Sequence, residues 1–183
     1  EFRRVLFRSR LLSRSASPAL ADHVLQHHRS QGIEVHLGAV VSAWEHDDQR
    51  LHAVIVDGQR LPVEQLVLGV GALPRTQLAQ DAGLACGDGV LVDACMRSSD
   101  PLILAIGDCA RCTPADGGAP LRLESIQNAQ DQARVAAATL LGEHAPYHPR
   151  PSFWSEQGLL RLQMSGLLDR KSTRLNSSHV ALS

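Results

Sequence analysis

The amino-acid sequence predicts an α/β fold with parallel strands, and two kinds of segment lead to that class. The runs QLVLGVGA (residues 65–72) and LILAIGD (residues 102–108) are almost continuously apolar and end close to glycines. Such runs are typical of strands covered on both faces, as in the parallel sheets of α/β proteins. Helical periodicity follows Ser17 and Ser125, so helices flank these strands along the chain.

Length and composition limit the function classes. The chain has 183 residues, enough for one domain or two small ones with a sizeable core. Its formal net charge of −1 and its aromatic content of 3% argue against binding to nucleic acid or to an anionic membrane. No run of about 18 apolar residues occurs, so no membrane span is expected. Four irregularly spaced cysteines indicate free thiols in a reducing compartment, the cytoplasm.

The first half of the chain predicts one helix and several strands. Ser17-Pro18 favours a helix start, because serine caps the first turn and proline suits the first helical position. The helix is expected to end at Gly32 and to bury a face formed by Leu20, Ala21, Val24, Leu25 and His28. Asp57-Gly58 predicts a tight hairpin turn. Strands are expected at 32–38, 39–46, 51–56, 59–65 and 65–72.

The second half predicts further strands and the longest helix. That helix begins at Ser125 and stops at Gly142. Its buried face is expected to be apolar and to consist of Ile126, Ala129, Ala133, Ala136, Ala137 and Leu140. The other expected segments are a short helix at 75–84 closed by Gly83, strands at 89–93 and 102–108, a loop at 113–120, a proline-rich linker at 144–151 and a β-containing unit at 152–167.

Gly107-Asp108 is the first candidate binding site, because it directly follows an apolar strand. Ligands collect at the carboxyl ends of strands in open α/β sheets. There a glycine lets a ligand approach the backbone, and a carboxylate accepts hydrogen bonds from sugar-like hydroxyls. The same dipeptide is also a common turn pair. The N-terminus of the helix at Ser125 is the second candidate, since its free N–H groups stabilise negative charge, although an ordinary packed helix has the same sequence features.

Three other motifs carry less weight. GVGALP (residues 69–74) lacks the third glycine of G-x-G-x-x-G and the acidic residue farther along. Cys109-x-x-Cys112 has neither the extra ligands of a zinc site nor the helix that follows a redox pair, which favours chance occurrence. His23 and His27 have metal-ligand spacing but no third ligand nearby in sequence, which favours a solvated helix face.

The two ends differ from the rest in composition. Residues 1–9 and 170–183 resemble translated sequencing adapters, so we exclude both from the fold prediction. Native disordered tails are the alternative. On the adapter interpretation, the natural protein is expected to be longer at both ends.

Four stretches together resemble one family: VGALPRTQLAQDAGL, GVLVDACMRSSDPLILAIGDCAR, RLESIQNAQDQARVAA and FWSEQGLLRLQMSGL. In order and spacing they are similar to FAD-dependent, NADH-using ferredoxin reductases of the pyridine nucleotide-disulphide oxidoreductase superfamily. The resemblance covers roughly residues 10–169. It implies a glutathione-reductase-like fold, in which residues 10–88 end the NAD-binding domain, 89–146 return to the FAD-binding domain and 147–169 start a C-terminal α+β domain.

The resemblance also implies roles for single residues in holding FAD. Asp108 matches the aspartate that holds the ribityl and pyrophosphate region, with Gly107 making room. Ile126 matches the residue whose N–H meets a flavin carbonyl, at the helix start capped by Ser125. Reduced flavin gathers negative charge on that side of its ring, which the helix N-terminus stabilises.

Three more positions are implied around FAD and its electron donor and acceptor. Trp154 matches an aromatic residue beside the flavin, where a [2Fe-2S] ferredoxin docks. Gly71 matches a turn near the nicotinamide nucleotide, and Glu124 matches an acid that faces the nicotinamide. Hydride is expected to pass from NADH to FAD, and single electrons then to the ferredoxin of a dioxygenase or cytochrome P450. The cofactor carries that chemistry, so no catalytic acid–base pair is expected here.

The sequence departs from the family in two respects. Cys112 stands where an aromatic residue is usual, and neither the FAD nor the NAD G-x-G-x-x-G fingerprint is present. The implied enzyme is therefore an incomplete reductase, which alone is expected to hold FAD poorly and to be inactive. The alternatives are a related flavoprotein of the nitrite reductase or NADH oxidase kind, and a non-catalytic flavin-fold binding module such as the apoptosis-inducing-factor group.

Overall fold

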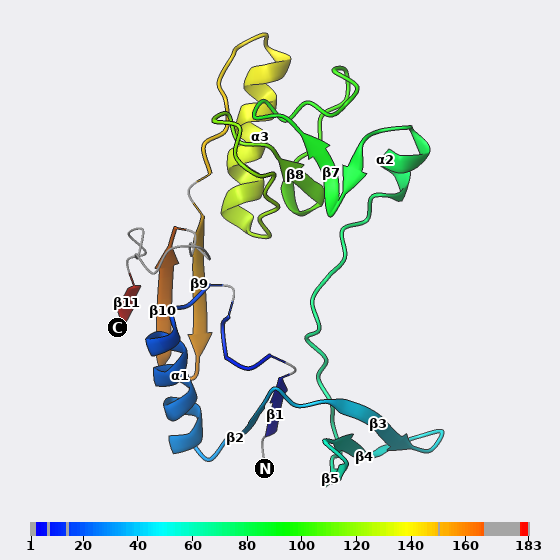
Figure 1. The fold of residues 1–183 in the computed structure, drawn as a ribbon, viewed down its shortest axis with the longest axis vertical. Helices are drawn as coiled ribbons and strands as arrows, with labels where there is room; N and C mark the ends of the chain where they lie inside the picture. The colour runs from blue at the N-terminus through cyan, green and yellow to red at the C-terminus, as the bar shows by residue number, and fades with distance from the viewer. Residues whose placement is uncertain (1–2, 7, 14, 150, 167–179, 183) are drawn as a thin grey trace. The chain divides into compact units, whose positions relative to one another are not determined.

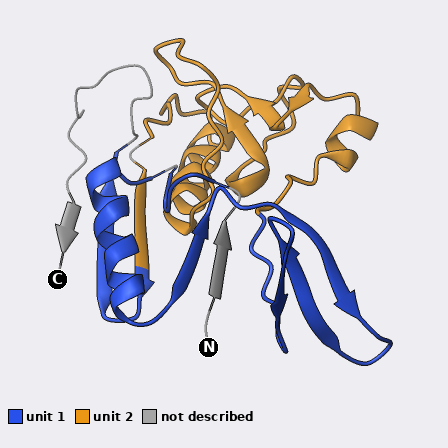
Figure 2. Ribbon diagram, turned by 60° about the horizontal axis from the view of Figure 1, so that its bottom comes forward, with its two compact units in different colours: residues 1–70, 156–178, 182–183 blue, residues 71–155, 179–181 orange. Residues whose placement is uncertain are grey.

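A computed structural model describes residues 3–6, 8–13, 15–149, 151–166 and 180–182 (Figure 1). The expected adapter-like tail at 170–183 therefore lies outside the described residues, apart from strand β11 at Val180–Leu182. The chain forms two compact units, residues 1–70 with 156–178 and 182–183, and residues 71–155 with 179–181 (Figure 2). We call them unit 1 and unit 2. The expected domain boundaries stay predictions.

Unit 1 contains the first predicted helix. Helix α1 spans Pro18–Ser30, and the Ser17 side chain accepts a hydrogen bond from the Leu20 N–H at 3.3 Å. Its buried residues are the five predicted ones, Leu20, Ala21, Val24, Leu25 and His28. Strand β1 (Arg3–Leu6) pairs in parallel with β2 (Glu34–Leu37). The sequence analysis had excluded the segment that forms β1 and so predicted no strand there.

Unit 1 also contains an antiparallel sheet with the predicted hairpin turn. Its strands β3 (Val41–His46), β4 (Leu51–Val56) and β5 (Gln59–Pro62) lie in that order. Asp57 and Gly58 have φ angles of 49° and 77°, so both adopt the left-handed conformation that a tight two-residue turn requires. Ala39, Val54 and Val56 form the buried cluster of this sheet.

The predicted strand at 65–72 is wrong. This segment is not a strand, and no residue in the described part of the chain pairs with it as a β-ladder. Its large apolar side chains are exposed, up to 94% at Val67. An apolar run forms a strand only where a neighbouring strand takes up its N–H and C=O groups, and the described chain provides none here.

Unit 2 holds the segments that carry the predicted binding residues. Its sheet has the order β6-β7-β8, antiparallel between the first two strands and parallel between the last two. The short helix predicted before it is present and is followed by Gly83 at φ 75°. The elements are α2 (Gln77–Asp81), β6 (Cys86–Gly87), β7 (Gly89–Val92), the 3₁₀ turn η1 (Gly107–Cys109), β8 (Ala110–Cys112) and α3 (Ile126–Leu140). The buried cluster contains Val90, Val92, Met96, Ala110, Cys112, Ala136 and Tyr147.

The predicted strand at 102–108 is also wrong. Only Leu104 makes a β-bridge, to Arg97, and Leu102 is 90% exposed. The parallel partner of β7 lies just beyond this run, in β8, where Val90 faces Ala110. Because β7 pairs with those later residues, the apolar run has no strand beside it and enters η1 directly.

Helix α3 begins as predicted, but it buries a different face. The Ser125 side chain caps it, accepting from the Asn128 N–H at 3.2 Å. Ile126, predicted to be buried, is 64% exposed. Polar side chains face inward instead, because each one bonds a backbone group. Of the predicted face only Ala136 is buried, and the buried residues of α3 are Asn128, Gln132, Ala136 and Thr139.

The segment after α3 has no regular structure until β9, as predicted for 144–151 in its described part. It is nevertheless packed: Tyr147 is 6% exposed, and its N–H donates to the Ala94 carbonyl at 2.7 Å. The predicted β-containing unit is present as a three-stranded sheet of β9 (Ser152–Gln157), β10 (Leu160–Ser165) and β11, with β10 in the centre. No helix among the described residues combines the length and apolar composition needed to cross a bilayer.

Candidate functional site

The turn at Gly107 places an exposed carboxylate at the end of an apolar segment. Gly107 is buried and has a φ of 74°, a left-handed conformation that favours glycine. Its N–H donates to the Gln132 Oε1 atom at 2.7 Å, a bond between buried groups. A Cβ atom at Gly107 would lie 3.6 Å from Ala129 Cβ, an ordinary contact, so the backbone angle and not a lack of space requires glycine. The side chain of Asp108 next to it is exposed.

The N-terminus of α3 presents amide groups beside this turn. Its cap, Ser125, satisfies the Asn128 N–H, and the Asn128 Nδ2 group donates to the Leu123 carbonyl at 2.9 Å. The first N–H groups of a helix have no carbonyl acceptor within the helix. At this end the Ile126 side chain points outward, so its N–H stands at an exposed helix end with partial positive charge.

Arg122 joins the two segments. Its Nη1 atom donates to the Asp108 carbonyl at 3.1 Å and forms an ion pair with Glu124 Oε1. Its Nη2 atom lies 3.0 Å from Asp88 Oδ1, and its side chain is only 12% exposed. Burial by itself would lower the pKa of Arg122, but the hydrogen bonds that it donates to Asp88 and Glu124, with the charges of those carboxylates, outweigh burial and raise the pKa. The Glu124 carboxylate is thereby oriented by a fixed positive charge.

Five of the seven predicted site residues therefore come together in unit 2. These are Gly107, Asp108, Glu124, Ser125 and Ile126, connected through Arg122, Gln132 and the packing of α3 on η1. Gly71 and Trp154 are not joined to them by any hydrogen bond or ion pair in the described chain. Gly71 has a φ of 93° with open space around it, and Trp154, on β9, is 61% exposed.

Sequence reasoning missed the side chains that hold this site in place. Gln132 fixes Gly107, Asn128 fixes the approach to α3, and Tyr147 donates its hydroxyl to Asn128 Oδ1 at 2.6 Å. A signal for the first two was available, because positions 128, 132, 136 and 139 recur at helical spacing and carry only amide or small side chains. Apolarity alone does not identify this buried face.

The chemistry of these groups fits FAD. An exposed carboxylate accepts hydrogen bonds from ribityl hydroxyls, and exposed amides at a helix start donate to a carbonyl oxygen. Both lie on neighbouring segments, and the buried Gln132 side chain holds the glycine turn that precedes the carboxylate.

The Cys109-x-x-Cys112 pair does not act as a unit in this structure. The Cys109 thiol donates to the Ile106 carbonyl at 3.4 Å, whereas the Cys112 thiol lies 3.5 Å from the carbonyl oxygens of Asp93 and Thr113. Burial raises the pKa of Cys112 to about 11, with smaller contributions from the charges of Asp93 and Cys95. All four cysteines are free. Among the described residues, no three His, Cys, Asp or Glu side chains group as metal ligands.

Comparison with known proteins finds relatives that are named as reductases of ferredoxin-type proteins. Terpredoxin reductase from a Pseudomonas species is 46% identical over 160 residues, which cover 86% of this chain and 39% of that protein. Putidaredoxin reductase from Pseudomonas putida is 38% identical over 162 residues, covering 87% of this chain and 38% of that protein. The chain thus spans about two fifths of the length of these relatives.

Two solved structures of ferredoxin-type reductases superimpose on most of this chain. The ferredoxin reductase for the CYP199A2 system from Rhodopseudomonas palustris superimposes with a TM-score of 0.86 at 38% identity, over 90% of this chain and 41% of that one. The putidaredoxin reductase in its covalent complex with putidaredoxin gives a TM-score of 0.84 at 35% identity, over 90% of this chain and 40% of that one.

The sequence profile of one family spans most of the chain. It is described as pyridine nucleotide-disulphide oxidoreductase and matches residues 3–133. This match confirms the predicted superfamily, and the structural superpositions confirm the predicted FAD/NAD(P)-binding fold class. The chain belongs to the pyridine nucleotide-disulphide oxidoreductase family.

Proposed function

We propose that this chain is part of an FAD-dependent oxidoreductase that passes electrons from NADH through FAD to a [2Fe-2S] ferredoxin serving a dioxygenase or a cytochrome P450. The observation that carries the proposal is the packing of the Gly107-Asp108 turn against α3, with the Gly107 N–H bonded to Gln132 at 2.7 Å. Two relatives of this chain are named as reductases of terpredoxin and putidaredoxin, which supports the choice of a ferredoxin as acceptor.

In this proposal each residue has a binding task. The Asp108 carboxylate accepts hydrogen bonds from the ribityl and pyrophosphate region. The Ile126 N–H, at the N-terminus of α3, donates to a flavin carbonyl. When bound, FAD exchanges a hydride with NADH and releases single electrons, while the protein supplies position and field. The anionic form of the ring is stabilised by the α3 N-terminus.

The remaining predicted residues serve the donor and the acceptor. Glu124, held by Arg122, faces the nicotinamide, and Gly71 forms a turn near the same nucleotide. Trp154 is exposed on β9, which suits an aromatic residue that meets an incoming ferredoxin. The expected domains, 10–88, 89–146 and 147–169, are part of the same proposal. A reducing cytoplasm suits a chain whose four cysteines are all free.

A hybrid enzyme tests this function. The chain would replace the aligned 160-residue segment of terpredoxin reductase, so that the rest of that reductase completes the protein. The hybrid is expected to bind one FAD and to reduce terpredoxin with NADH. Folding is checked by circular dichroism. A folded hybrid that binds no FAD would overturn the proposal.

Other outcomes identify the alternatives. NADH oxidation that consumes oxygen but reduces no ferredoxin would indicate an oxidase-like flavoprotein. Stoichiometric FAD without NADH oxidation would indicate a non-catalytic flavin-fold module. Because the sequence contains no G-x-G-x-x-G fingerprint, the isolated chain is expected to hold FAD poorly. Stoichiometric flavin absorbance after desalting of the isolated chain would contradict that expectation.

Asp108→Ala in the hybrid tests the assigned carboxylate. Loss of a charge-assisted hydrogen bond is expected to weaken FAD binding on the order of tenfold or more. Asp116→Ala is the matched control, because among the described residues its carboxylate accepts from the Gly118 N–H alone, within a surface turn. Equal FAD affinity in the two variants would remove Asp108 from the proposed site.

A further inference from the structure

Unit 2 also contains a cavity, and the residues that line it are not those assigned to FAD. A cavity of about 320 Å³ is lined by side chains that include Asp93, Cys95, Thr113 and His144, with two prolines, Pro114 and Pro146, in its wall. None of these residues belongs to the proposed flavin site. A thiol, an imidazole and a carboxylate therefore all line this cavity.

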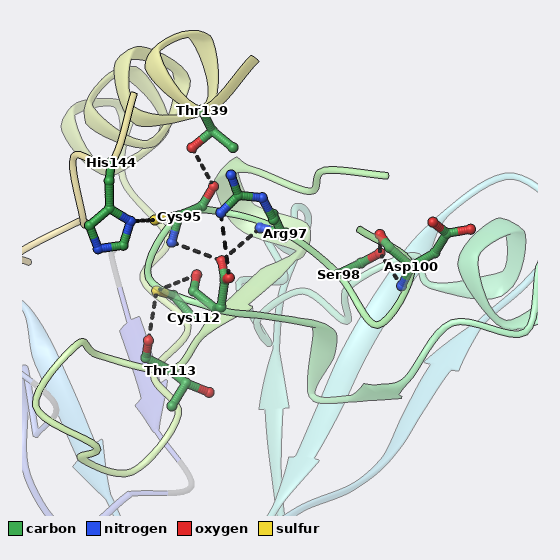
Figure 3. A network of polar contacts seen from close by, with 9 residues as sticks. Cys95, Arg97, Ser98, Asp100, Cys112, Thr113, Thr139 and His144 are labelled. Atoms are coloured by element: carbon green, nitrogen blue, oxygen red, sulfur yellow. Dashed lines mark hydrogen bonds and ion pairs between the residues drawn. The ribbon is translucent and has the colours of Figure 1, made fainter. Parts of the chain in front are cut away.

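The thiol and the imidazole face each other. The Cys95 Sγ atom lies 3.6 Å from His144 Nδ1, the contact drawn as a dashed line in Figure 3. At this separation the thiol can donate its proton to Nδ1 when the ring carries its own proton on Nε2. A histidine in this position can accept the thiol proton and so generate the thiolate, which is the reactive form of cysteine.

The backbone of Cys95 is held on both sides. Its N–H donates to Asp93 Oδ1 at 2.8 Å, and its carbonyl accepts from the Thr139 Oγ1 hydroxyl of α3 at 2.9 Å. The backbone of Cys95 is therefore fixed in position. Cys95 is only 3% exposed, and it is one of the residues that line this cavity, which is open to solvent.

The neighbouring buried thiol is arranged differently. Cys112 lies 3.5 Å from two backbone carbonyl oxygens and contacts no imidazole among the described residues, and burial raises its pKa to about 11. Cys112 therefore stays protonated near neutral pH, which leaves Cys95 as the buried thiol with a proton acceptor. The other titratable and charged groups around Cys95 are Asp93, Arg97 and His144.

The charge of the cavity indicates what it accepts. Asp93 Oδ1 receives the N–H groups of Cys95 and Arg97, whereas Oδ2 is 4.0 Å from the Arg97 guanidinium and only loosely paired. The Asp93 side chain is 54% exposed, so this oxygen remains open to a cation. A short aliphatic amine suits a small cavity with a carboxylate and two prolines.

We propose that Cys95, with His144 as its proton acceptor, is a modification site that forms a mixed disulfide with a small cationic aminothiol. The Cys95 proton passes to His144 Nδ1, and the thiolate attacks one sulfur of an aminothiol disulfide. The S–S bond of the reagent breaks as the new S–S bond to Cys95 forms. The departing thiolate takes the proton from His144. Cys95 is oxidised and the departing aminothiol is reduced, so atoms and electrons balance.

The test uses the full chain with cystamine as the probe. Intact mass spectrometry follows the addition of one cysteamine, and peptide mapping of the wild-type chain locates it. Cys95 is expected to react ahead of the more exposed Cys86 and Cys109. First labelling at Cys86, Cys109 or Cys112 would overturn the proposal.

Variants separate proton transfer and charge from simple access. His144→Asn keeps a hydrogen-bond acceptor but not a base, and it is expected to slow labelling on the order of tenfold and to flatten its pH profile between pH 6 and 8. Cys112→Ser is the control and should label as the wild type does. An unchanged rate and pH profile in His144→Asn would remove His144 from the step.

A matched pair of probes tests the cationic preference. Dithiodipropionate has an acidic group where cystamine has an amine, and it is expected to react about tenfold more slowly with the wild-type chain. Asp93→Asn keeps the acceptor for the Cys95 N–H but loses the charge, and it should reduce that preference. Equal rates with the two probes would contradict an aminothiol site.

Discussion

The side chain of Gln132 shows how a buried polar residue can determine the shape of a binding turn. Its Oε1 atom is the acceptor for the Gly107 N–H, and the residue is 1% exposed. Gln132→Leu is expected to lower the free energy of unfolding by about 1–3 kcal/mol, because the buried N–H loses its acceptor. Urea denaturation measures this loss, and hydrogen exchange at the Gly107 amide locates it.

Gln130→Leu is the matched control for this prediction. Gln130 is exposed and lies two positions before Gln132 on the same helix. Its substitution should therefore change the stability by no more than about 0.5 kcal/mol. Equal destabilisation by the two substitutions would assign the effect to helix propensity and not to the bond with Gly107.

Tyr147 makes the stability of the fold depend on pH in the alkaline range. Burial raises the pKa of its phenol from 10.0 to about 12, with smaller contributions from the charges of Asp131 and Cys112. The folded state therefore favours the neutral phenol. The corresponding stability is complete below pH 10 and is lost as the pH rises from 10 to 12.

Tyr147→Phe should show both consequences of that arrangement. It removes the donor to the buried Asn128 Oδ1 atom, so at pH 8 the chain is expected to be less stable by about 1–3 kcal/mol. Between pH 10 and 12 its melting temperature should fall less steeply than that of the wild type. Identical slopes in thermal melts over this range would contradict the assignment to Tyr147.

Residue-level prediction from sequence succeeded where one local rule decides and failed where tertiary contacts decide. Ser17 and Ser125 cap their helices as predicted, because capping involves only the first turn. The inward face of α3 was mispredicted, since Asn128 and Gln132 are buried to satisfy the Leu123 carbonyl and the Gly107 N–H. Those partners lie outside the helix, so the periodicity of the helix sequence does not predict them.

At the level of elements, the turn between β3 and β4 depends on one carboxylate. Asp47 Oδ1 accepts from the N–H groups of Gln49 and Arg50 at 2.8 Å each, and Oδ2 lies 2.8 Å from His52 Nε2. These bonds, the one from Gln49 first, lower the pKa of Asp47 from 3.8 to about 2. The ionised form is favoured in the fold, so this contribution is present above pH 4 and is lost as the pH falls toward 2.

Asp47→Ala is expected to remove the same contribution at neutral pH. The amides of β4 should then exchange faster with solvent, and the remaining pH dependence between 4 and 2 should become shallower. Asp48→Ala is the control, because Asp48 is the exposed neighbour in the same turn. Hydrogen exchange followed by NMR distinguishes the two variants, and equal exchange in both would count against the role of Asp47.

Strands were predicted correctly where the strand with which they pair is close in the sequence. The hairpin at Asp57-Gly58 brings its own two strands together, and it formed as predicted. The runs at 65–72 and 102–108 were identified as strands from apolarity, yet a strand is defined by its neighbour. No neighbour for them exists in the described chain, except the single bridge at Leu104.

For the whole molecule, these two runs leave large apolar side chains in contact with solvent. Val67 is 94% exposed and Leu102 is 90% exposed. Exposed apolar segments of this kind promote association. The double variant Val67→Lys with Leu102→Lys is expected to self-associate less than the wild-type chain and to keep the same circular dichroism spectrum. Sedimentation velocity over a range of concentrations measures the difference, and identical sedimentation of both proteins would contradict it.

Helix α3 connects two chemical centres that the chain keeps apart. Gln132 holds the turn before Asp108, and Thr139, seven residues farther along, holds the carbonyl of Cys95. Two helical turns, roughly 10 Å of stiff rod, separate these attachment points. A displacement of this helix along its axis would therefore move both attachment points together.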